Sequence, residues 1–452
     1  MTDISIQWGD DVLAVPLPAD WTVQQIATPT ITPAGNDWPE RLARALTRPE
    51  AMRPLGELLS SKPDARIAII VEDITRHSPL TKILEIIFRE IRHAGIPNEN
   101  IEIIFATGMH RAITPEEATR KIGTLAEQIT WRCNPWRDRN AYVHLGVVDD
   151  GGYRMEVLVD RRVVEADVRI IISSVSPHLQ AGFGGGYKML IPGCSHLETI
   201  RRLHLCNIPR RARQQVGQSS NINRMRRLID KAGKLLDSQH GVSFSVQYIL
   251  DMAGGVATVA SGDVITCQRM LAKSCSATCG VILNAPADVV ITSAYPRDFD
   301  LWQSFKAIAN TCWAARENGV IICLTRTPGG VNMPMVSSPI PPRRIRQFVR
   351  FIGANALSSL IMRVVPSLSS DATFFIRIAL QILQRNTLVM VSPTLAKTDA
   401  KIPGIYLFDT PQAAIAAADA ELGPGNKRVV VFPAGGITYP VLPKPACKSS
   451  GK

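Results

Sequence analysis

Short apolar runs alternate along this chain with longer segments that have helical periodicity. The first run, Arg66–Glu72, precedes a helical segment at Leu80–His93. A second run, Ile101–Ala106, precedes Thr114 and Pro115, which are typical of a helix cap and the first helical position. Strands that alternate with helices in this way predict an α/β fold of Rossmann-like type, with mostly parallel sheets flanked by helices.

The length of 452 residues exceeds what one hydrophobic core usually serves, so two α/β domains are expected. We expect an N-terminal domain over 1–283, a C-terminal domain over 284–440 and a flexible tail over 441–452. An opening hairpin is predicted at Ile4–Trp8 and Val12–Leu17. The other predicted strands are Val168–Ser173, Phe244–Leu250, Val289–Thr292, Val320–Cys323, Thr387–Val391 and Val429–Phe432, and further helices are predicted at Asn221–Leu236 and Asp300–Arg316.

Composition narrows the class of protein. Hydrophobic residues make up 46% and charged residues 20%, as in soluble globular proteins. No leader is visible, and the lipophilic stretch Phe351–Met362, bounded by arginines, is too short to span a bilayer, so it predicts a buried or interfacial helix. The nine cysteines form no C-x-x-C pair and indicate reduced thiols. We therefore expect a cytoplasmic protein without a membrane partner.

The net charge of +12 admits a nucleic-acid partner, and arginines cluster at Arg224–Arg227 and Arg343–Arg346 among other places. No basic tail, zinc finger or aromatic RNA-binding signature accompanies these clusters. They are more typical of solvated helix faces. We expect no nucleic acid, and an anionic small molecule accounts for the charge more simply.

A glycine-rich segment, Gly182–Lys188, follows the predicted strand Val168–Ser173, with His178 before it and His204 after it. Neither the P-loop spacing nor the dinucleotide-binding spacing of glycines is present. The segment lies past the carboxyl end of a strand, where open α/β sheets bind their ligands. A tight turn with a solvated lysine is the alternative interpretation.

Other reactive side chains also follow predicted strands. Asp73-Ile74-Thr75-Arg76 comes after the first run, and Gly108-Met109-His110-Arg111 after the second. Gln303 and Lys306 lie on the predicted helix after Val289–Thr292. Because ligands bind at the carboxyl ends of strands, these residues are expected to meet in one crevice between the domains.

This set resembles the nickel-pincer lactate racemase family. His178, Lys188 and His204 occur at the family's spacing, and Asp-x-Thr-Arg, Gly-x-His-Arg and Gln-x-x-Lys follow its order. The resemblance covers most of the chain. It implies a racemase or epimerase of 2-hydroxy acids that works by proton-coupled hydride transfer, with a small anionic hydroxy acid as substrate.

The resemblance also implies a cofactor, the nickel-pincer nucleotide, which is a pyridinium-3-thioamide-5-thiocarboxylic acid mononucleotide carrying nickel. Lys188 matches its attachment point and His204 its nickel ligand, and cofactor-biosynthesis enzymes would be maturation partners. Asp73 is expected to orient Arg76 or a cofactor hydroxyl. The ring is expected to lie flat against the glycines Gly184, Gly185 and Gly186.

The remaining roles concern the substrate. His110 and His178 match the two histidines that act as base and acid on opposite faces of the substrate. Arg76 matches the arginine that binds the substrate carboxylate. Gln303 and Lys306 match residues that reach in from the second domain. The other five histidines are expected to be structural or solvent-facing, and they are His77, His93, His144, His196 and His240. Among them, His196 is the nearest competitor as metal ligand.

Two residues depart from the lactate-acting pattern. Tyr187 stands where an arginine is expected, and Trp302 where a tyrosine is expected. Both are expected to border the cofactor or substrate, which indicates a substrate other than lactate. Two other functions remain open: net redox chemistry on a hydroxy acid with the same cofactor, and non-catalytic binding by the same fold.

Overall fold

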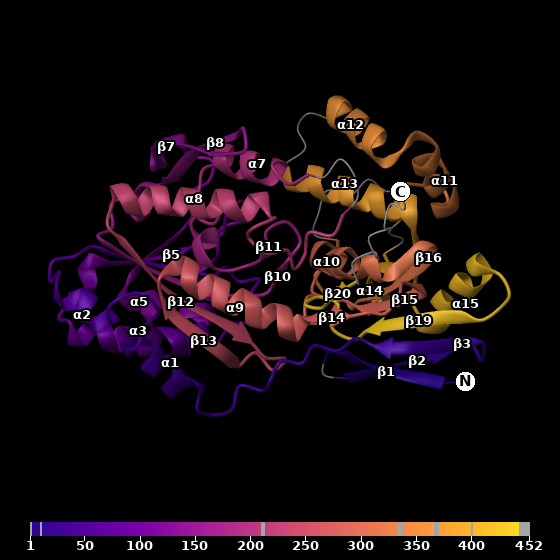
Figure 1. Cartoon of the computed structure of the whole chain (residues 1–452), viewed down its shortest axis with the longest axis horizontal. Helices are drawn as coiled ribbons and strands as arrows, with labels where there is room; N and C mark the ends of the chain where they lie inside the picture. Colours follow the sequence, from indigo (N-terminus) through magenta and orange to yellow (C-terminus); the bar gives the residue numbers. More distant parts are fainter. Residues whose placement is uncertain are drawn as a thin grey trace, which may run out of the picture. The chain divides into compact units, whose positions relative to one another are not determined.

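The computed structural model describes residues 2–9, 11–208, 213–331, 338–365, 370–398 and 401–442. The chain divides into two compact units (Figure 1). Unit 2 consists of Ile31–Ile208 and Gln215–Ala277, and unit 1 of Met1–Thr30, Pro209–Gln214 and Thr278–Lys452. The N-terminal segment, which the sequence grouped with the first domain, thus belongs to the same unit as the C-terminal segment. The expected tail lies outside the described residues from residue 443 onward.

The sheet of unit 2 has six strands, in the order β13 (Val256–Gly262), β12 (Val242–Leu250), β9 (Val168–Ser174), β4 (Ile67–Val71), β5 (Ile101–Phe105) and β6 (Thr130–Cys133). The strands from β12 to β6 are parallel, and β13 is antiparallel to β12. Every residue of β4 is buried, which explains its unbroken apolar sequence.

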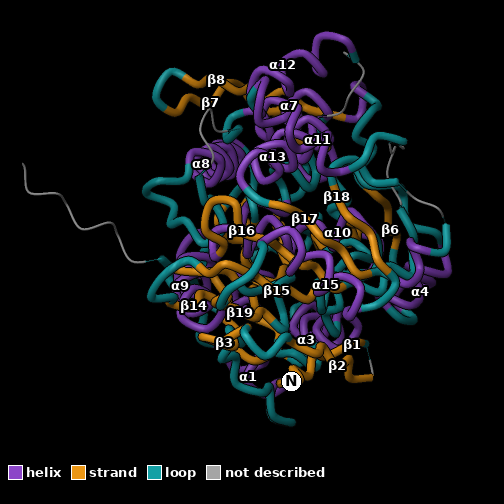
Figure 2. Tube along the Cα trace, turned by 90° about the vertical axis from the view of Figure 1, so that its right-hand side faces the viewer, coloured by secondary structure: helices purple, strands orange, loops and turns teal. Residues whose placement is uncertain are grey.

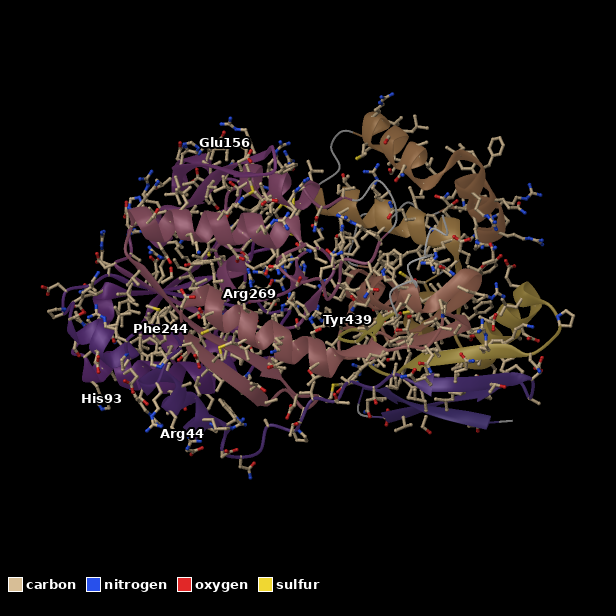
Figure 3. All side chains as sticks on the ribbon, in the orientation of Figure 1. Arg44, His93, Glu156, Phe244, Arg269 and Tyr439 are labelled. Carbon is tan, nitrogen blue, oxygen red and sulfur yellow. The ribbon has the colours of Figure 1, made fainter. Side chains whose placement is uncertain are left out.

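Helices cover both faces of this sheet. One face packs on α1 (Trp38–Thr47), α2 (Leu55–Ser60), α3 (Leu80–His93), α4 (Pro115–Ile122) and α5 (Leu125–Gln128). The other packs on α6 (Arg161–Val164), α7 (Leu197–Leu205), α8 (Arg224–Gln239), α9 (Val264–Cys279) and the hairpin of β7 (Tyr142–Asp150) and β8 (Tyr153–Asp160). Phe244 of β12 is fully buried in the first of these layers, whereas His93 at the end of α3 is exposed (Figure 3).

The sheet of unit 1 is entirely parallel. Its strand order is β18 (Ile405–Phe408), β17 (Thr387–Val391), β16 (Ala315–Leu324), β15 (Ala287–Ser293), β19 (Lys427–Phe432) and β3 (Trp21–Ile26). The hairpin of β1 (Thr2–Trp8) and β2 (Asp11–Leu17) packs with α15 (Pro411–Leu422) on one face. A separate parallel pair joins β14 (Gly280–Ile282) to β20 (Tyr439–Val441).

Five further helices complete unit 1: α10 (Leu301–Thr311), α11 (Pro342–Ile352), α12 (Ala354–Val364), α13 (Ser370–Arg385) and α14 (Pro393–Ala396). Of these, α10 and α13 pack against the sheet, and α11 and α12 pack on α13. Figure 2 shows the same arrangement from the side, with α12 outermost. The one helix predicted at Phe351–Met362 is therefore two helices, because Gly353 adopts a positive φ of 89° and ends α11.

The predicted α/β class is confirmed, because parallel strands dominate both sheets and helices flank them. The helix predicted at Leu80–His93 and the strand predicted at Thr387–Val391 have the predicted bounds. The helix predicted at Asp300–Arg316 was too long. A short 3-10 turn, η4 (Cys312–Ala314), ends it, and Ala315 already pairs with Ala287 at the start of β16.

Candidate active site

The loops that follow β4 and β5 bring a carboxylate and an imidazole together. Asp73 Oδ2 lies 2.5 Å from His110 Nδ1. Asp73 is buried, whereas 52% of the His110 side chain is exposed. A carboxylate partner places the proton on Nδ1, so the lone pair of the neutral ring is on Nε2. The pair therefore provides an oriented, accessible base.

The surroundings of Asp73 keep it ionised. Its other oxygen, Oδ1, accepts hydrogen bonds from the Thr75 backbone N–H at 3.0 Å and the Thr75 hydroxyl at 2.5 Å. Burial alone would raise the pKa of Asp73. The hydrogen bond and charge of His110, the charge of Arg76 and the Thr75 hydroxyl outweigh burial and hold the pKa well below its ordinary value. The carboxylate contacts His110, where the sequence led us to expect Arg76 or a cofactor hydroxyl.

Lys121, in the last turn of α4, fixes the loop that carries Arg76. Its Nζ donates to the Arg76 carbonyl oxygen at 2.5 Å and to Ser78 Oγ at 3.3 Å. Burial lowers the pKa of this amine. The sequence missed Lys121, because a lysine near the end of a charged helix usually faces solvent.

Glu72 joins the ends of three strands behind the pair. Its carboxylate accepts hydrogen bonds from the Ser174 backbone N–H at 2.7 Å, the Ser78 hydroxyl at 2.9 Å and the Tyr248 hydroxyl at 3.0 Å. These donors come from β9, the loop after β4 and β12. Glu72 is only 5% exposed, so it is a structural carboxylate that holds the loop bearing Asp73 in place.

His178 lies in a small hairpin formed by β10 (Pro177–His178) and β11 (Gly182–Phe183). Its Nδ1 accepts hydrogen bonds from the backbone N–H groups of Gln180 at 3.2 Å and Ala181 at 3.1 Å. An accepting Nδ1 places the proton of the neutral ring on Nε2. His178 and His110 thus have opposite tautomers.

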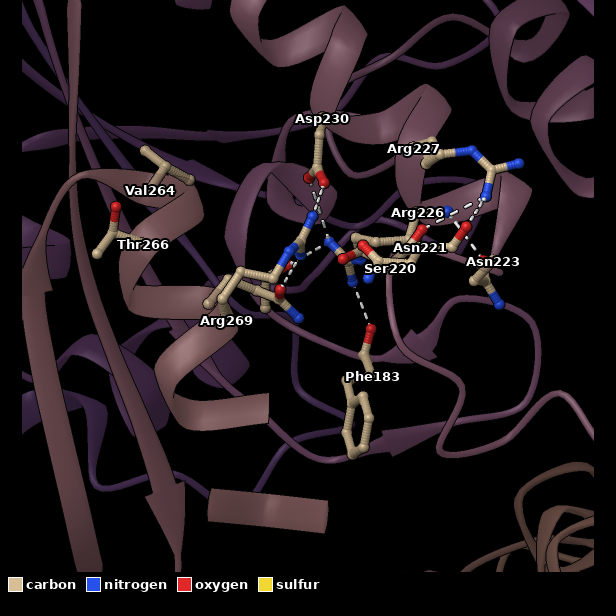
Figure 4. Close-up of polar contacts among 12 residues, drawn as sticks. Phe183, Ser220, Asn221, Asn223, Arg226, Arg227, Asp230, Val264, Thr266 and Arg269 are labelled. Carbon is tan, nitrogen blue, oxygen red and sulfur yellow. Dashed lines mark hydrogen bonds and ion pairs between the residues drawn. The ribbon is translucent and has the colours of Figure 1, made fainter. Parts of the chain in front are cut away.

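The glycine-rich loop is held from beneath by a buried arginine of α8. Arg226, 1% exposed, donates to the carbonyl oxygen of Phe183 (Figure 4). It also donates to the carbonyl oxygens of Gly184 and Gly185. Its guanidinium also lies 3.9 Å from the Asp230 carboxylate. Burial lowers the pKa of Arg226 to about 10. The sequence assigned the Arg224–Arg227 cluster to a solvated helix face. That prediction was wrong for Arg226, because its guanidinium donates hydrogen bonds to the loop carbonyls.

The conformation of this loop explains two of its glycines. Gly185 and Gly186 have φ of 75° and 65°, a region that favours glycine. A Cβ on Gly185 would approach the Gln247 side chain to 2.9 Å, and one on Gly186 would approach Gln268 to 3.0 Å. These two glycines are therefore required by packing within the protein itself. A Cβ on Gly184 would meet only ordinary contacts.

Lys188 stands in η3 (Gly186–Met189), directly after this loop, and is half-buried. Backbone hydrogen bonds connect its turn to the His110 loop: Gly193 N–H donates to the Lys188 carbonyl at 3.2 Å, and Gly108 N–H donates to the Gly193 carbonyl at 2.9 Å. Lys188 and His110 thus belong to directly bonded loops of unit 2.

His204 is half-buried in the last turn of α7. Just beyond this helix, Asn207 donates through Nδ2 to the Gln180 carbonyl at 2.7 Å, and Asn223 donates to the same oxygen at 2.8 Å. The end of the His204 helix is therefore bonded to the His178 hairpin. Neither asparagine was singled out in the sequence, because contacts between segments far apart in the chain leave no local motif.

Gln303 and Lys306 lie one turn apart on α10 of unit 1, and both are half-buried. Lys306 Nζ donates to Gln303 Oε1 at 2.7 Å. Their spacing on one helix face is as predicted. Their part in a common site with the unit 2 residues stays a prediction.

Tyr187 does not have the environment expected of it, whereas the expected position of Trp302 beside the substrate or cofactor stays a prediction. Tyr187 is 3% exposed in the core of unit 2, and its hydroxyl donates to Asp237 Oδ2 at 2.5 Å. Its ring packs over Gly233 of α8. The expectation that Tyr187 borders the cofactor or substrate was therefore wrong. Trp302 packs against Phe375 of α13, with ring centroids 4.0 Å apart.

The remaining histidines agree with the structural interpretation. His196 caps the N-terminus of α7, and its Nδ1 accepts from the Glu198 backbone N–H at 3.3 Å. That bond gives His196 a structural function. His144 lies 2.5 Å from Glu156 on the β7–β8 hairpin, and His77, His93 and His240 are exposed.

Comparisons with known proteins find relatives that match most of the chain. Residues 8–215 match the model of the lactate racemase N-terminal domain, a span that includes every unit 2 site residue. The chain is 28% identical over 337 residues to the lactate racemase of Thermoanaerobacterium thermosaccharolyticum, covering 73% of this chain and 76% of that protein. It is 26% identical over 299 residues to the lactate racemase of Lactiplantibacillus plantarum, covering 64% of this chain and 66% of that protein.

Solved structures share the fold. The lactate racemase apoprotein from T. thermosaccharolyticum superposes with a TM-score of 0.79 at 23% identity, covering 98% of this chain and 100% of that one. A protein from Thermotoga maritima gives a TM-score of 0.64 at 16% identity, with coverage of 90% and 98%. The fold and the matched N-terminal segment define an α/β protein of the racemase type. The chain is thus similar to the lactate racemases in its N-terminal segment, in sequence over most of its length, and in fold.

Proposed function

We propose that this chain is a cytoplasmic racemase or epimerase of a 2-hydroxy acid that acts through a nickel-pincer nucleotide tethered to Lys188. The observation that carries the proposal is the Asp73–His110 pair, an oriented base whose loop is bonded to the loop of Lys188. Similarity to the lactate racemases supports the same reaction class. Cofactor-biosynthesis enzymes would be the maturation partners.

The residues present fit this cofactor. Lys188 offers a half-buried amine on a loop that a buried arginine fixes, and His204 offers a half-buried imidazole. Two buried hydroxyls at strand ends, Thr107 Oγ1 and Ser173 Oγ, have no hydrogen-bond partner among the described residues. Such hydroxyls can bind a polar nucleotide. When bound, the cofactor would accept hydride from C2 of the substrate.

Nickel would take few ligands from the protein. Among the described residues, no group of three or more His, Cys, Asp or Glu side chains could hold a metal ion. His204 would supply one nitrogen ligand, and the remaining donors would come from the cofactor's own arms. Such nitrogen- and sulfur-rich coordination suits square-planar nickel(II).

His110 and His178 would transfer the proton of the substrate hydroxyl. His110 would accept it at Nε2, because Asp73 holds the proton on Nδ1 and stabilises the imidazolium that forms. His178 would contact the hydroxyl of the other enantiomer. In the described conformation its Nε2 carries a proton, so the ring can donate a hydrogen bond there. To act as a base at Nε2, His178 would have to release the two N–H groups of its hairpin.

The cationic side chains would position the substrate. The guanidinium of Arg76 could bind a carboxylate through two parallel hydrogen bonds, and Lys121 fixes the backbone from which it projects. Gln303 and Lys306 would complete the recognition from α10. Because Tyr187 lies in the core, it no longer argues against lactate, and the hydroxy acid has to be identified by assay.

The proposal is tested by optical rotation of chiral 2-hydroxy acids, including lactate, sugar acids and aryl-substituted acids. The chain would be co-expressed with the cofactor-building enzymes. A racemase abolishes the rotation of a substrate without accumulating keto acid, and an epimerase brings it to a constant residual value. Lys188→Arg should remove the activity, whereas Lys234→Arg, an exposed lysine of α8, should retain it. Keto acid that accumulates with an external acceptor would instead indicate net redox chemistry.

A further inference from the structure

Two helices of unit 1 present an outer face that combines apolar and basic side chains. This α11–α12 face consists of Arg343, Arg344, Phe348, Arg350, Phe351, Leu360, Arg363 and Val364, all exposed. Phe351 is 90% exposed and Val364 is 71% exposed. Large apolar side chains so open to water on one face usually mark a binding surface. The catalytic proposal makes no use of this face.

Helical geometry places the exposed apolar side chains of each helix on one side. On α11, Arg344, Phe348 and Phe351 are spaced at i, i+4 and i+7, so they share one side of the helix. On α12, Leu360 and Val364 are spaced at i and i+4.

The opposite sides of both helices pack inward. Val349, Ala354 and Ser358 are at most 1% exposed, and both helices contact α13. Figures 1 and 2 both show α12 on the outer side of α13. Each helix therefore already has one buried side. Its exposed apolar residues form a second side, separate from the one that packs in the core.

The charge of this segment has one sign. Residues 338–365 contain five arginines and no aspartate or glutamate. Arg346 points inward, where it donates to the Asn386 carbonyl at 3.2 Å and lies 3.5 Å from Glu421. The other four arginines stay on the exposed side. A partner for this face must therefore be anionic as well as apolar.

An anionic lipid surface meets both requirements. Helices that lie in the membrane interface insert aromatic and aliphatic side chains among the acyl chains, while arginines attract anionic headgroups. Nucleic acid would use the arginines and leave the phenylalanines in water. A second copy of the chain would bring the same positive charge to the contact. No helix in the described part of the chain is long and apolar enough to cross a membrane, so the contact would be peripheral.

We propose that the α11–α12 face binds the surface of membranes that contain anionic phospholipids. The sequence led us to expect no membrane partner, and this inference replaces that expectation with reversible surface binding. It rests on side chains of unit 1 alone and is independent of the catalytic proposal.

The test is sedimentation of the full chain with vesicles of phosphatidylcholine, with and without phosphatidylglycerol. Wild type should bind the anionic vesicles and be released by salt. Phe348→Ser with Phe351→Ser should weaken binding at least about tenfold through lost apolar burial. Each of Arg343→Gln, Arg344→Gln and Arg350→Gln should weaken it about fivefold. Phe299→Ser and Lys234→Gln change exposed residues elsewhere and should have no effect.

Three outcomes would overturn the proposal. One is absence of binding to the anionic vesicles by a wild-type chain whose thermal unfolding is cooperative. Another is a concentration-dependent dimer that the phenylalanine substitutions abolish, which would assign the face to a second copy. The third is retention on DNA that the arginine substitutions reduce and the phenylalanine substitutions do not, which would assign it to nucleic acid.

Discussion

Asp73 is the residue on which the proposed chemistry depends most, because its carboxylate fixes the tautomer of His110. In Asp73→Asn an amide replaces the carboxylate, so the imidazolium formed by His110 loses its counter-charge. We expect kcat on the identified substrate to fall on the order of 10²-fold, with a smaller change in KM. The pH profile of kcat should also shift, which a merely structural change would not produce. Asp64→Asn, at an exposed position, is the matched control.

The lowered pKa of Asp73 also predicts how the stability of the folded chain depends on pH. Its folded-state pKa lies below the unfolded value, so between the two the unfolded chain binds more protons. The stabilisation from Asp73 is thus complete above about pH 4 and is lost as pH falls through the folded-state pKa. The difference in Tm between wild type and Asp73→Asn should shrink as the buffer goes from pH 6 to pH 3. A Tm difference that stays the same from pH 6 to pH 3 would contradict the lowered pKa of Asp73.

At the residue scale, the sequence named candidate site residues but could not predict which partners their side chains contact. Motif spacing singled out Asp73 and His110, but only the fold showed that they contact each other. Tyr187 was misassigned because a position next to Lys188 says nothing about the direction of the side chain. In a 3-10 turn, neighbouring side chains point to different sides, and that of Tyr187 enters the core.

At the scale of elements, α8 supports the loop that carries Lys188. Replacing the guanidinium in Arg226→Met would remove the Arg226 donor from the carbonyls of Phe183 and Gly185, whereas the Gly184 carbonyl would keep the Gln268 side-chain amide as a donor. We expect a cost of about 3 kcal/mol, concentrated in the loop. Amide hydrogen exchange of residues 183–189 should then accelerate by about 10²-fold.

Arg224→Met, on the exposed side of the same helix, is the control for this prediction. It should change exchange in the loop by less than about threefold, because Arg224 is 41% exposed and its partner Asp150 keeps Arg227 and Lys231 as ion-pair partners. Equal acceleration by both substitutions would mean that α8 itself has loosened, and that Arg226 has no specific function in the loop.

Element prediction succeeded where burial imposes a pattern. The helix α3 has a regular apolar side and β17 is buried throughout, and both were predicted with their bounds. The strand β3 was missed because half of its residues are polar and it lies at a sheet edge. Its pairing with β19 joins segments far apart in the sequence, and local pattern carries no information about such a contact.

At the scale of the whole molecule, the sequence predicted two α/β domains, but it could not assign the N-terminal segment. That assignment depends on β3 pairing with β19 and on the β1–β2 hairpin packing over the unit 1 sheet. The α11–α12 face likewise became visible only in three dimensions, because the sequence of Phe351–Met362 fits a buried helix as well as an exposed one.

For the molecule as a whole, we propose that the fold carries a covalently tethered nickel cofactor. Intact mass and nickel content, measured after co-expression with the cofactor-building enzymes, test it most directly. We predict a mass increment that maps to the peptide containing Lys188, close to one nickel per chain, and loss of both in Lys188→Arg. In His204→Ala the increment should remain while nickel falls. An unmodified Lys188 peptide in chain co-expressed with enzymes that load a known lactate racemase would contradict the account.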